Sequence, residues 1–308
     1  MQKETFTYPS AVAEQTLHAV VFIPEGKPRG IVQIIHGYAE HVGRYERFME
    51  ILANAGFITF GNDHAGHGLS APSEERLTDI GAYNALYSVL EDAYILNKRM
   101  RERFGAELPC TILGHSMGSL MLRALLCVYP EICDGAIIMG TGDKGLGMLR
   151  IFSILLSVYS FFHKGSWRSG FISKIAIEDN NKKFKPARTP HDWLSANTDN
   201  VDRYIADPYC GKRGTLHTFR FLQELMTLVR QPKHLANMKK DLPVFFVSGE
   251  DDAFGDFTDG VREVIVLFEE AGMTEVSARF FEGMRHEILH EEGAEQVVQA
   301  CLENVVVR

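Results

Sequence analysis

Short apolar runs alternate with segments of helical periodicity along most of the chain. A nearly continuous apolar run, typical of a strand that is buried on both faces, lies at residues 30–36, and short strand-like runs lie at 110–113, 134–139 and 243–247. Further strand-like runs lie at 16–24, 57–60 and 276–281. Between the runs, apolar residues recur at helical spacing in 45–55, 83–104, 117–129, 260–271 and 294–306. This alternation predicts an α/β protein with a mostly parallel central sheet and helices on both of its faces.

Residues 143–238 break this alternation. They contain both tryptophans, many other aromatic residues and several helical stretches, but no regular succession of strand and helix. We therefore predict an α/β core made of residues 1–142 and 239–308, with residues 143–238 inserted between two core strands as a helical cap. A chain of 308 residues accommodates such an insertion within one catalytic domain.

One segment of the predicted cap, residues 151–162 with the sequence IFSILLSVYSFF, is strongly apolar. It is shorter than the roughly 20 residues that a membrane-spanning helix needs. The segment is therefore expected either to pack as a helix within the cap or to face outward as an apolar lid. As a lid, it offers an acyl-chain pocket or a transient contact with a lipid surface.

Charge and cysteine content narrow the class of protein. The chain carries 32 basic and 40 acidic side chains, a net charge of −8, which excludes a generally basic nucleic-acid binder and a strongly cationic membrane-surface protein. The five cysteines form no C-x-x-C pair, and several lie in apolar runs. The first residues are polar and do not resemble a signal peptide. Together these features predict reduced thiols and a cytoplasmic location.

The strongest chemical signal is Gly114-His115-Ser116-Met117-Gly118, which matches the pattern G-x-S-x-G. It lies between a predicted strand and a predicted helix, where a sharp turn holds the serine oxygen exposed above the sheet. Glycines on both sides let the chain bend there without a steric clash. Ser116 is therefore the candidate nucleophile.

A serine hydroxyl needs a base, and the base needs an orienting acid. In this architecture the chain order is serine, acid, histidine. The loop after the penultimate predicted strand offers Asp251, Asp252 and Asp256 as acids, and the loop after the last strand offers His286 as the base. Both loops follow the carboxyl ends of parallel strands, where catalytic groups gather in such sheets. The spacing alone leaves the choice among the three aspartates open.

These motifs give the chain a resemblance to the α/β-hydrolase superfamily. Within it, the chain is similar to the monoacylglycerol lipase and lysophospholipase-like group, which is also classed with serine aminopeptidases. The resemblance covers nearly the whole chain. It rests on His36-Gly37-Tyr38-Ala39-Glu40-His41 with Arg44-Tyr45, Asp63-His64-Ala65-Gly66-His67-Gly68-Leu69-Ser70, Gly114-His115-Ser116-Met117-Gly118, Gly249-Glu250-Asp251-Asp252, and Arg285-His286-Glu287.

The resemblance implies roles for individual residues. The family's acid lies three residues after the glycine, which selects Asp252. The backbone N–H groups of Tyr38 and Met117 are implied as the oxyanion hole, which stabilises the negative oxygen of an acyl-transfer intermediate. Many relatives continue after the acid with Pro-Val, where this chain has Ala253-Phe254. The implied substrates are monoacylglycerols or lysophospholipids, with no cofactor and no metal.

These residues predict a serine hydrolase that cleaves carboxylic esters through an acyl-serine intermediate. Ser116 attacks, His286 moves the proton and Asp252 orients His286. A serine aminopeptidase related to proline iminopeptidases would share the three residues, but would need an acidic anchor in the cap for the substrate's amino group. A non-enzymatic binding protein on this fold is expected to lack one of the three. The expected partner is a small ester or lipid molecule rather than nucleic acid, and the oligomeric state stays open.

Two further motifs suggest other chemistry. His286-Glu287-Ile288-Leu289-His290 spells H-E-x-x-H, a zinc-protease pattern, but it starts at the end of a strand and has Gln296 where a third histidine would be. Gly140-Thr141-Gly142-Asp143-Lys144-Gly145 spells G-x-G-x-x-G, but an aromatic helical block follows it instead of a βαβ unit. We expect that His286 alone of the first motif is catalytic, and that the glycines of the second form a hinge into the cap.

Overall fold

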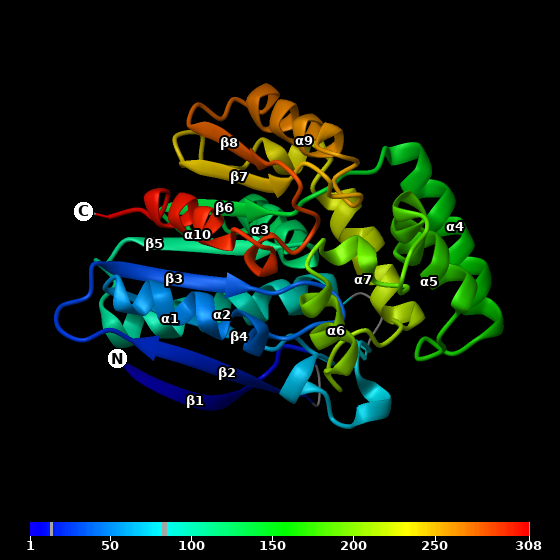
Figure 1. The fold of residues 1–308 in the computed structure, drawn as a ribbon, viewed down its shortest axis with the longest axis horizontal. Coiled ribbons are helices and arrows are strands. Elements are labelled where there is room, and N and C mark those ends of the chain that lie inside the picture. Colours follow the sequence, from blue (N-terminus) through cyan, green and yellow to red (C-terminus); the bar gives the residue numbers. More distant parts are fainter. Residues whose placement is uncertain (13–14, 82–84, 308) are drawn as a thin grey trace.

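In the computed structural model, which describes residues 1–12, 15–81 and 85–307, eight strands form one open sheet in the order β1-β2-β4-β3-β5-β6-β7-β8 (Figure 1). All neighbouring pairs from β4 to β8 are parallel, whereas β1 and β2 pair antiparallel with each other and β2 pairs antiparallel with β4. This confirms the predicted mostly parallel sheet. The strands are β1 (Gln2–Pro9), β2 (Thr16–Ile23), β3 (Gly30–Ile35), β4 (Phe57–Asn62), β5 (Cys110–His115), β6 (Gly135–Met139), β7 (Val244–Gly249) and β8 (Val276–Phe281).

Helices cover both faces of the sheet, and each face has its own apolar core. One core joins the sheet to α1 (Glu46–Asn54) and α10 (Ala294–Glu303). The other joins it to α2 (Leu86–Phe104), α3 (Met117–Val128) and α9 (Asp259–Glu270). Central strands such as β3, β5 and β7 are buried along their whole length. Because both faces are covered, these strands need apolar residues at every position, which explains their continuous apolar runs.

Most predicted elements lie within a few residues of their predicted positions. Residues 83 and 84 of the predicted helix at 83–104 lie outside the described residues, and α2 runs from Leu86 to Phe104. No predicted strand corresponds to β1, which is an edge strand of mostly polar and exposed residues. Only Tyr8 of β1 is buried, so no apolar run marks it.

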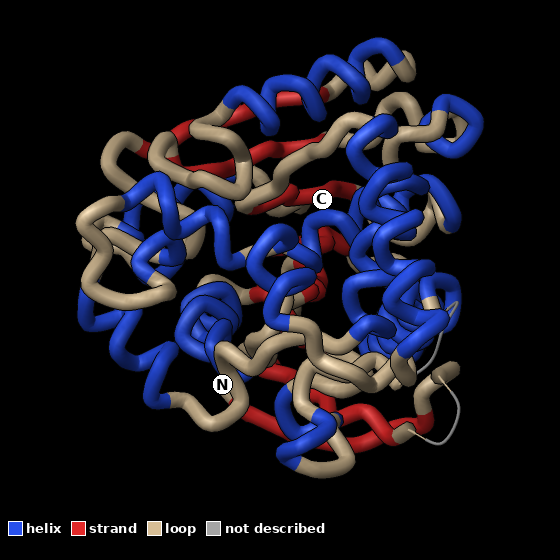
Figure 2. Tube along the Cα trace, turned by 90° about the vertical axis from the view of Figure 1, so that its right-hand side faces the viewer, coloured by secondary structure: helices blue, strands red, loops and turns tan. Residues whose placement is uncertain are grey.

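Between β6 and β7 the chain forms α4 (Leu146–Phe162), α5 (Gly170–Ala176), α6 (Thr198–Ala206), α7 (Leu216–Leu228) and α8 (Pro232–Leu235), joined by loops and by the 3-10 segments Glu178–Phe184 and Asp192–Leu194. Most of these helices lie beyond the carboxyl ends of the parallel strands, where α4 packs against α7 (Figures 1 and 2). The apolar run at 151–162 forms the larger part of α4. Among the described residues, no helix is both long enough and apolar enough to cross a membrane.

Candidate active site

Ser116 lies in the tight turn between β5 and α3. Its backbone has φ 55° and ψ −118°, in the left-handed half of backbone space that side chains other than glycine rarely adopt. The turn requires both flanking glycines. A Cβ at Gly114 would lie 2.3 Å from the carbonyl oxygen of Gly118, and a Cβ at Gly118 would lie 2.0 Å from that of Ile35. The chain therefore bends at Ser116 as the motif predicts.

Asp252 and His286 follow the neighbouring strands β7 and β8. Asp252 Oδ2 lies 2.9 Å from Nδ1 of His286. The other carboxylate oxygen, Oδ1, accepts a hydrogen bond of 2.8 Å from the backbone N–H of Phe254, and the side chain is fully buried. A carboxylate in this position holds the ring proton on Nδ1, which leaves Nε2 as the basic nitrogen of His286.

The structure separates the three candidate aspartates. Asp252 is buried against His286, whereas Asp251 and Asp256 are exposed. Asp256 lies in the turn before α9 at a φ of 50°. The arrangement in space therefore agrees with Asp252, the residue implied by the resemblance.

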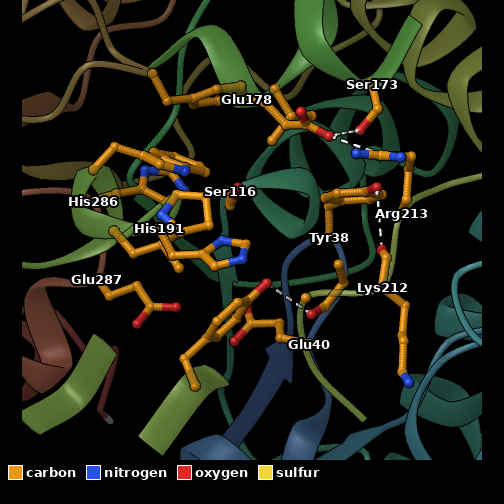
Figure 3. Close-up of a pocket in the computed structure, with 18 of the residues that line it drawn as sticks. Tyr38, Glu40, Ser116, Ser173, Glu178, His191, Lys212, Arg213, His286 and Glu287 are labelled. Atoms are coloured by element: carbon orange, nitrogen blue, oxygen red, sulfur yellow. Dashed lines mark hydrogen bonds and ion pairs between the residues drawn. The ribbon is translucent and has the colours of Figure 1, made fainter. Parts of the chain in front are cut away.

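The Nε2 atom of His286 is buried and has no hydrogen-bond partner among the described residues. The ring is held in place by Trp193, Phe254 and His115, whose ring centroids lie 4.9, 5.3 and 4.8 Å from its own. His286 and Ser116 line the same cavity of about 280 Å³, as Figure 3 shows. The unpaired nitrogen is therefore positioned to accept a proton from a group in this cavity.

The backbone N–H groups of Tyr38 and Met117 come from the loop after β3 and from the first residue of α3. A Cβ at Gly37 would lie 3.1 Å from the Cβ of Ser116, so the loop before Tyr38 runs directly against the serine. Within the described ranges, neither N–H donates a hydrogen bond. Two free donors beside a serine are able to bind a negative oxygen. No motif indicated a role for the Tyr38 side chain, but its hydroxyl accepts a hydrogen bond of 2.6 Å from the N–H of Gly214.

A buried ionic network lies next to the site and was not predicted from the sequence. Arg44 Nη1 lies 2.8 Å from Glu40 Oε2, and Arg44 Nη2 lies 2.8 Å from Glu287 Oε2. Glu40 also accepts a hydrogen bond of 2.6 Å from the N–H of Gly37, and Asn200 of α6 donates one of 2.6 Å to Glu287. The network therefore joins the loop of Tyr38, the loop of His286 and the helical segment. Glu40, Arg44 and Glu287 stand in the quoted motifs and Asn200 does not, and nothing in the spacing of these residues showed that they would meet.

His115, the residue before Ser116, connects this network to His286. One ring nitrogen, Nε2, lies 3.1 Å from the backbone oxygen of His286, and the other, Nδ1, lies 2.7 Å from the hydroxyl of Tyr45. Burial by itself would lower the pKa of His115, but the nearby Glu40 carboxylate raises it above the usual value. Burial would likewise raise the pKa of Glu40, and its contacts with His115 and Arg44 bring that pKa well below the usual value. This side of the site is therefore built from buried charge.

Two cavities meet at Ser116. The first, of about 280 Å³, carries polar and charged side chains, among them Glu40, Glu178, His191, Lys212 and Arg213. The second, of about 260 Å³, lies between α4 and α7 and is mostly apolar, with Leu149, Phe152, Leu155, Phe219, Leu222 and Met226 in its wall. Tyr38, Ser116, Ile177 and Phe254 line both cavities. A molecule bound at Ser116 would therefore contact polar side chains at one end and apolar side chains at the other.

The two other motifs take ordinary structural roles. His286 lies in a loop and His290 in a separate 3-10 turn, so the H-E-x-x-H residues do not share one helix, and the glutamate binds Arg44. In the G-x-G-x-x-G turn, Arg123 Nη1 donates a hydrogen bond of 3.0 Å to the backbone oxygen of Gly142. In the described part of the chain, one group of three side chains has potential metal-ligand atoms that all lie within 4.8 Å of one another: His41, Asp207 and Cys210. In this group, His41 Nε2 already contacts Asp207 Oδ2 at 2.9 Å.

The sequence of this chain is similar to a known family and to named lipases. A family model described as "Serine aminopeptidase, S33" matches residues 26–293. The monoacylglycerol lipase of Mycolicibacterium smegmatis is 33% identical over 120 residues, which span 39% of this chain and 40% of that protein. The monoglyceride lipase of Mus musculus is 22% identical over 273 residues, which span 87% of this chain and 78% of that protein.

Solved structures share the fold over nearly the whole chain. A thermostable carboxyl esterase from Bacillus coagulans in complex with glycerol has a TM-score of 0.89 at 24% identity, covering 99% of this chain and 100% of that one. A soluble variant of the monoglyceride lipase from Saccharomyces cerevisiae in complex with a substrate analog has a TM-score of 0.75 at 18% identity, covering 98% of this chain and 93% of that one. At these sequence identities, the similarity establishes a shared fold and nothing more.

Proposed function

Because this chain belongs to the serine aminopeptidase S33 family and has the α/β-hydrolase fold, we propose that it is a serine hydrolase of lipid-like carboxylic esters. One observation carries the proposal. His286 is bound through Nδ1 to a buried carboxylate, its Nε2 is unpaired among the described residues, and His286 lines the same cavity as Ser116. A positioned base beside a serine is the arrangement that nucleophilic acyl transfer requires.

In the proposed reaction, His286 Nε2 takes the hydroxyl proton of Ser116 as Ser116 Oγ bonds to the ester carbon. The tetrahedral intermediate collapses, the bond to the alcohol oxygen breaks, and His286 returns the proton to that oxygen. Water then attacks the acyl-serine with His286 again as the base, which releases the acid and restores Ser116. Asp252 keeps the His286 ring oriented and stabilises its positive charge in both steps.

The N–H groups of Tyr38 and Met117 are proposed to bind the oxygen that becomes negative in each step. Both groups lack a partner within the described residues, so binding the oxyanion breaks no existing hydrogen bond. Donors fixed in place before the reaction stabilise the transition state without a cost of reorganisation. Gly37 supports this role, because its lack of a side chain lets the loop approach Ser116.

We propose that residues 143–238 form a cap that sorts the two ends of the substrate. The apolar cavity between α4 and α7 suits an acyl chain, and the polar cavity suits the alcohol, such as glycerol or a lysophospholipid headgroup. The monoacylglycerol and monoglyceride lipases among the relatives support this substrate class. A cytoplasmic location is also proposed, supported by five cysteines that are all buried and unpaired.

A serine aminopeptidase remains the second candidate, since the cap does place an acidic residue in the polar cavity. Glu178 lines that cavity, but its Oε1 contacts Arg213 Nε at 3.1 Å and accepts a hydrogen bond of 2.7 Å from Ser173. The Arg213 guanidinium already offsets the charge of this carboxylate, so the carboxylate would attract a substrate amino group less strongly. The occupied anchor therefore favours esters over peptides.

A substrate panel tests the proposal. The panel consists of p-nitrophenyl esters from acetate to palmitate, monoacylglycerols, lysophosphatidylcholine and aminoacyl anilides. Ser116→Ala is expected to lower ester hydrolysis by on the order of 10⁴-fold or more and to abolish labelling by a fluorophosphonate probe. The matched control is Ser166→Ala, an exposed serine outside both cavities. Labelling that survives Ser116→Ala, or a preference for the anilides, would contradict the proposal.

A further inference from the structure

Three side chains that can bind a metal meet where residues 143–238 contact the loop after β3. His41 belongs to that loop, and Asp207 and Cys210 belong to the turn that follows α6. One potential ligand atom of each side chain lies within 4.8 Å of the other two. None of the three residues lines either cavity at Ser116, and none takes part in the proposed reaction. They therefore form a group separate from the candidate active site.

The fold holds these three side chains in place. The N–H of Cys210 donates a hydrogen bond to the backbone oxygen of Asp207 at 3.1 Å, and the N–H of Tyr209 donates one of 2.9 Å to Asp207 Oδ1. The two side chains from the helical segment thus share one hydrogen-bonded turn. The His41 ring packs edge-on against Tyr209, and a Cβ at Gly43 would lie 2.9 Å from His41 Nδ1. These contacts leave Nε2 of His41 directed at Asp207.

The distances within the group suit a small cation. Nε2 of His41 lies 2.9 Å from Asp207 Oδ2, so the two atoms share a proton. Burial alone would raise the pKa of Asp207, but the hydrogen bond with His41 brings that pKa below the usual value. A tetrahedral Zn²⁺ holds its nitrogen, oxygen and sulfur ligands roughly 3.3–3.7 Å apart. Because the separations here run from 2.9 Å to at most 4.8 Å, side-chain movements of about 1 Å are enough to reach that geometry.

The thiol of Cys210 is the observation that points to a ligand. Cys210 is only 6% exposed, and within the described residues its Sγ has no hydrogen-bond partner. Burial raises the pKa of this thiol well above its usual value, so the metal-free side chain is neutral. A metal ion removes the proton from a coordinating thiol, which turns an unpaired buried group into a strong ligand.

The charges around this thiol favour a cation. The ionic groups with the largest effect on it are one guanidinium and three carboxylates, those of Arg44, Asp207, Glu40 and Glu287. Three negative charges against one positive charge leave the surroundings negative. The side chains of His41 and Asp207 are 18% and 26% exposed. A hydrated cation can therefore reach the group from solvent and keep one water as a fourth ligand.

We propose that His41 Nε2, a carboxylate oxygen of Asp207 and Cys210 Sγ bind a divalent cation of the Zn²⁺ class, with water in the fourth position. Imidazole, carboxylate and thiolate are the ligands that Zn²⁺ takes in proteins, whereas Mg²⁺ and Ca²⁺ prefer oxygen ligands alone. On binding, Cys210 releases its thiol proton to solvent and bonds to the metal as a thiolate. The proton on His41 Nε2 moves to Nδ1, which frees Nε2 as a ligand.

The metal joins the helical segment to the loop that carries Tyr38. That segment already contacts the loop, because the N–H of Gly211 and the hydroxyl of Tyr204 each donate a hydrogen bond of 3.0 Å to the backbone oxygen of Ala39. A metal bound to His41 adds a cross-link two residues further along the chain. Binding should therefore stabilise the folded protein. The site does not rest on the proposed function, and its tests need no turnover.

Cobalt substitution tests the site directly. Co²⁺ occupies the same nitrogen and sulfur sites as Zn²⁺ but binds more weakly. A bond between cobalt and a thiolate gives a charge-transfer absorption band in the near ultraviolet, which nitrogen and oxygen ligands do not give. We expect one equivalent of Co²⁺ to produce this band in the wild-type protein, and one equivalent of Zn²⁺ to remove it.

Two substitutions identify the ligands. Cys210→Ser keeps the shape of the side chain but lacks the thiolate, and should abolish the cobalt band. His41→Gln keeps a hydrogen-bond donor near Asp207 but lacks the ring nitrogen. Each is expected to weaken Zn²⁺ binding, measured by calorimetry, by about a hundredfold or more. Cys127→Ser is the matched control, since Cys127 is also a buried, unpaired cysteine but lies in α3, outside the group, and should change neither measurement.

Thermal unfolding without metal checks that each variant is folded. Added Zn²⁺ should raise the midpoint of unfolding in the wild type and in Cys127→Ser, and not in Cys210→Ser. A cobalt spectrum without the thiolate band, or the same band in Cys210→Ser, would overturn the site. Zn²⁺ binding that both Cys210→Ser and His41→Gln leave unchanged would place the metal elsewhere and overturn it too. Ester hydrolysis that survives Ser116→Ala would contradict the proposed function alone and leave the metal site unaffected.

Discussion

The two sides of Ser116 are held together by different forces. On one side, Glu40, Arg44 and Glu287 form a buried ionic network that fixes the loops carrying Tyr38 and His286. On the other side, α4 and α7 enclose an apolar cavity by side-chain packing. Directional contacts set the position of the loops, whereas packing sets only the size and shape of a space. Changes on the charged side should therefore disturb the whole site, and changes on the apolar side should alter which substrates fit.

Arg44→Met is the sharpest test of the charged side. It leaves two buried carboxylates without their cation, which is expected to cost about 3–5 kcal/mol of unfolding free energy. Chemical denaturation measures this loss, and Arg47→Met is the control, because Arg47 is exposed and its loss should change stability by no more than about 0.5 kcal/mol. Equal effects of the two substitutions would show that the network does not hold the site together.

Met226→Trp tests the apolar side by filling its cavity. Met226 is half-buried in the cavity wall, and the larger ring is expected to lower kcat/KM for palmitoyl esters by roughly tenfold to a hundredfold. Hydrolysis of acetyl esters, which do not need the space, should change by no more than about twofold. Met226→Leu preserves the volume and serves as the control. An equal loss for acetyl and palmitoyl esters would remove the distinction between the two sides.

The charged side should also make the fold sensitive to acid. Burial, with a smaller contribution from the nearby Arg44, lowers the pKa of His290 to about 4, below the usual 6.5. The unfolded chain therefore binds a proton at His290 between these pH values that the folded chain does not. The contribution of neutral, buried His290 to the free energy of unfolding is therefore present above pH 6.5. This contribution is lost as the pH falls toward 4, at up to about 1.4 kcal/mol per pH unit.

Denaturation curves between pH 4 and 7 measure this dependence. His290→Gln should flatten the slope, whereas His163→Gln, which changes an exposed histidine of the helical segment, should leave it unchanged. An identical slope in wild type and His290→Gln would show that this histidine does not report the acid sensitivity of the charged side.

Arg213→Gln has the smallest expected effect and tests the polar cavity alone. The substitution frees Glu178, which then becomes available to a substrate amino group. Both side chains are more than a third exposed, so solvent screens the pair and changes of only a few-fold are expected. Hydrolysis of aminoacyl anilides should rise relative to esters. If the anilide rate does not rise relative to the ester rate, Glu178 is not the residue that separates the two substrate classes.

The central strands could be predicted from the sequence because parallel strands covered on both faces are apolar at every position. The edge strand β1 could not, since it is antiparallel, exposed and largely polar. The turn of Ser116 was also readable, because two glycines around a serine satisfy a steric demand within five residues. Among Asp251, Asp252 and Asp256, residue spacing alone did not decide.

The ionic network shows why contacts between distant parts of the chain could not be predicted from the sequence. Arg44 and Glu287 are separated by 243 positions, and their contact depends on how two loops meet above the sheet. Likewise, Trp193 in the helical segment packs on His286, and nothing in the local sequence around either residue indicates it. Contacts of this kind arise only when the chain has folded.

The sequence by itself determined the α/β class, the family and the residues Ser116, Asp252 and His286 as candidates, because periodicity and short motifs express local steric and chemical demands. Only the tertiary structure decided which carboxylate reaches His286, that Glu178 is already paired, and that one face of α4 is exposed. Burial and pairing are properties of the packed molecule, since they depend on which distant surfaces exclude water from each other.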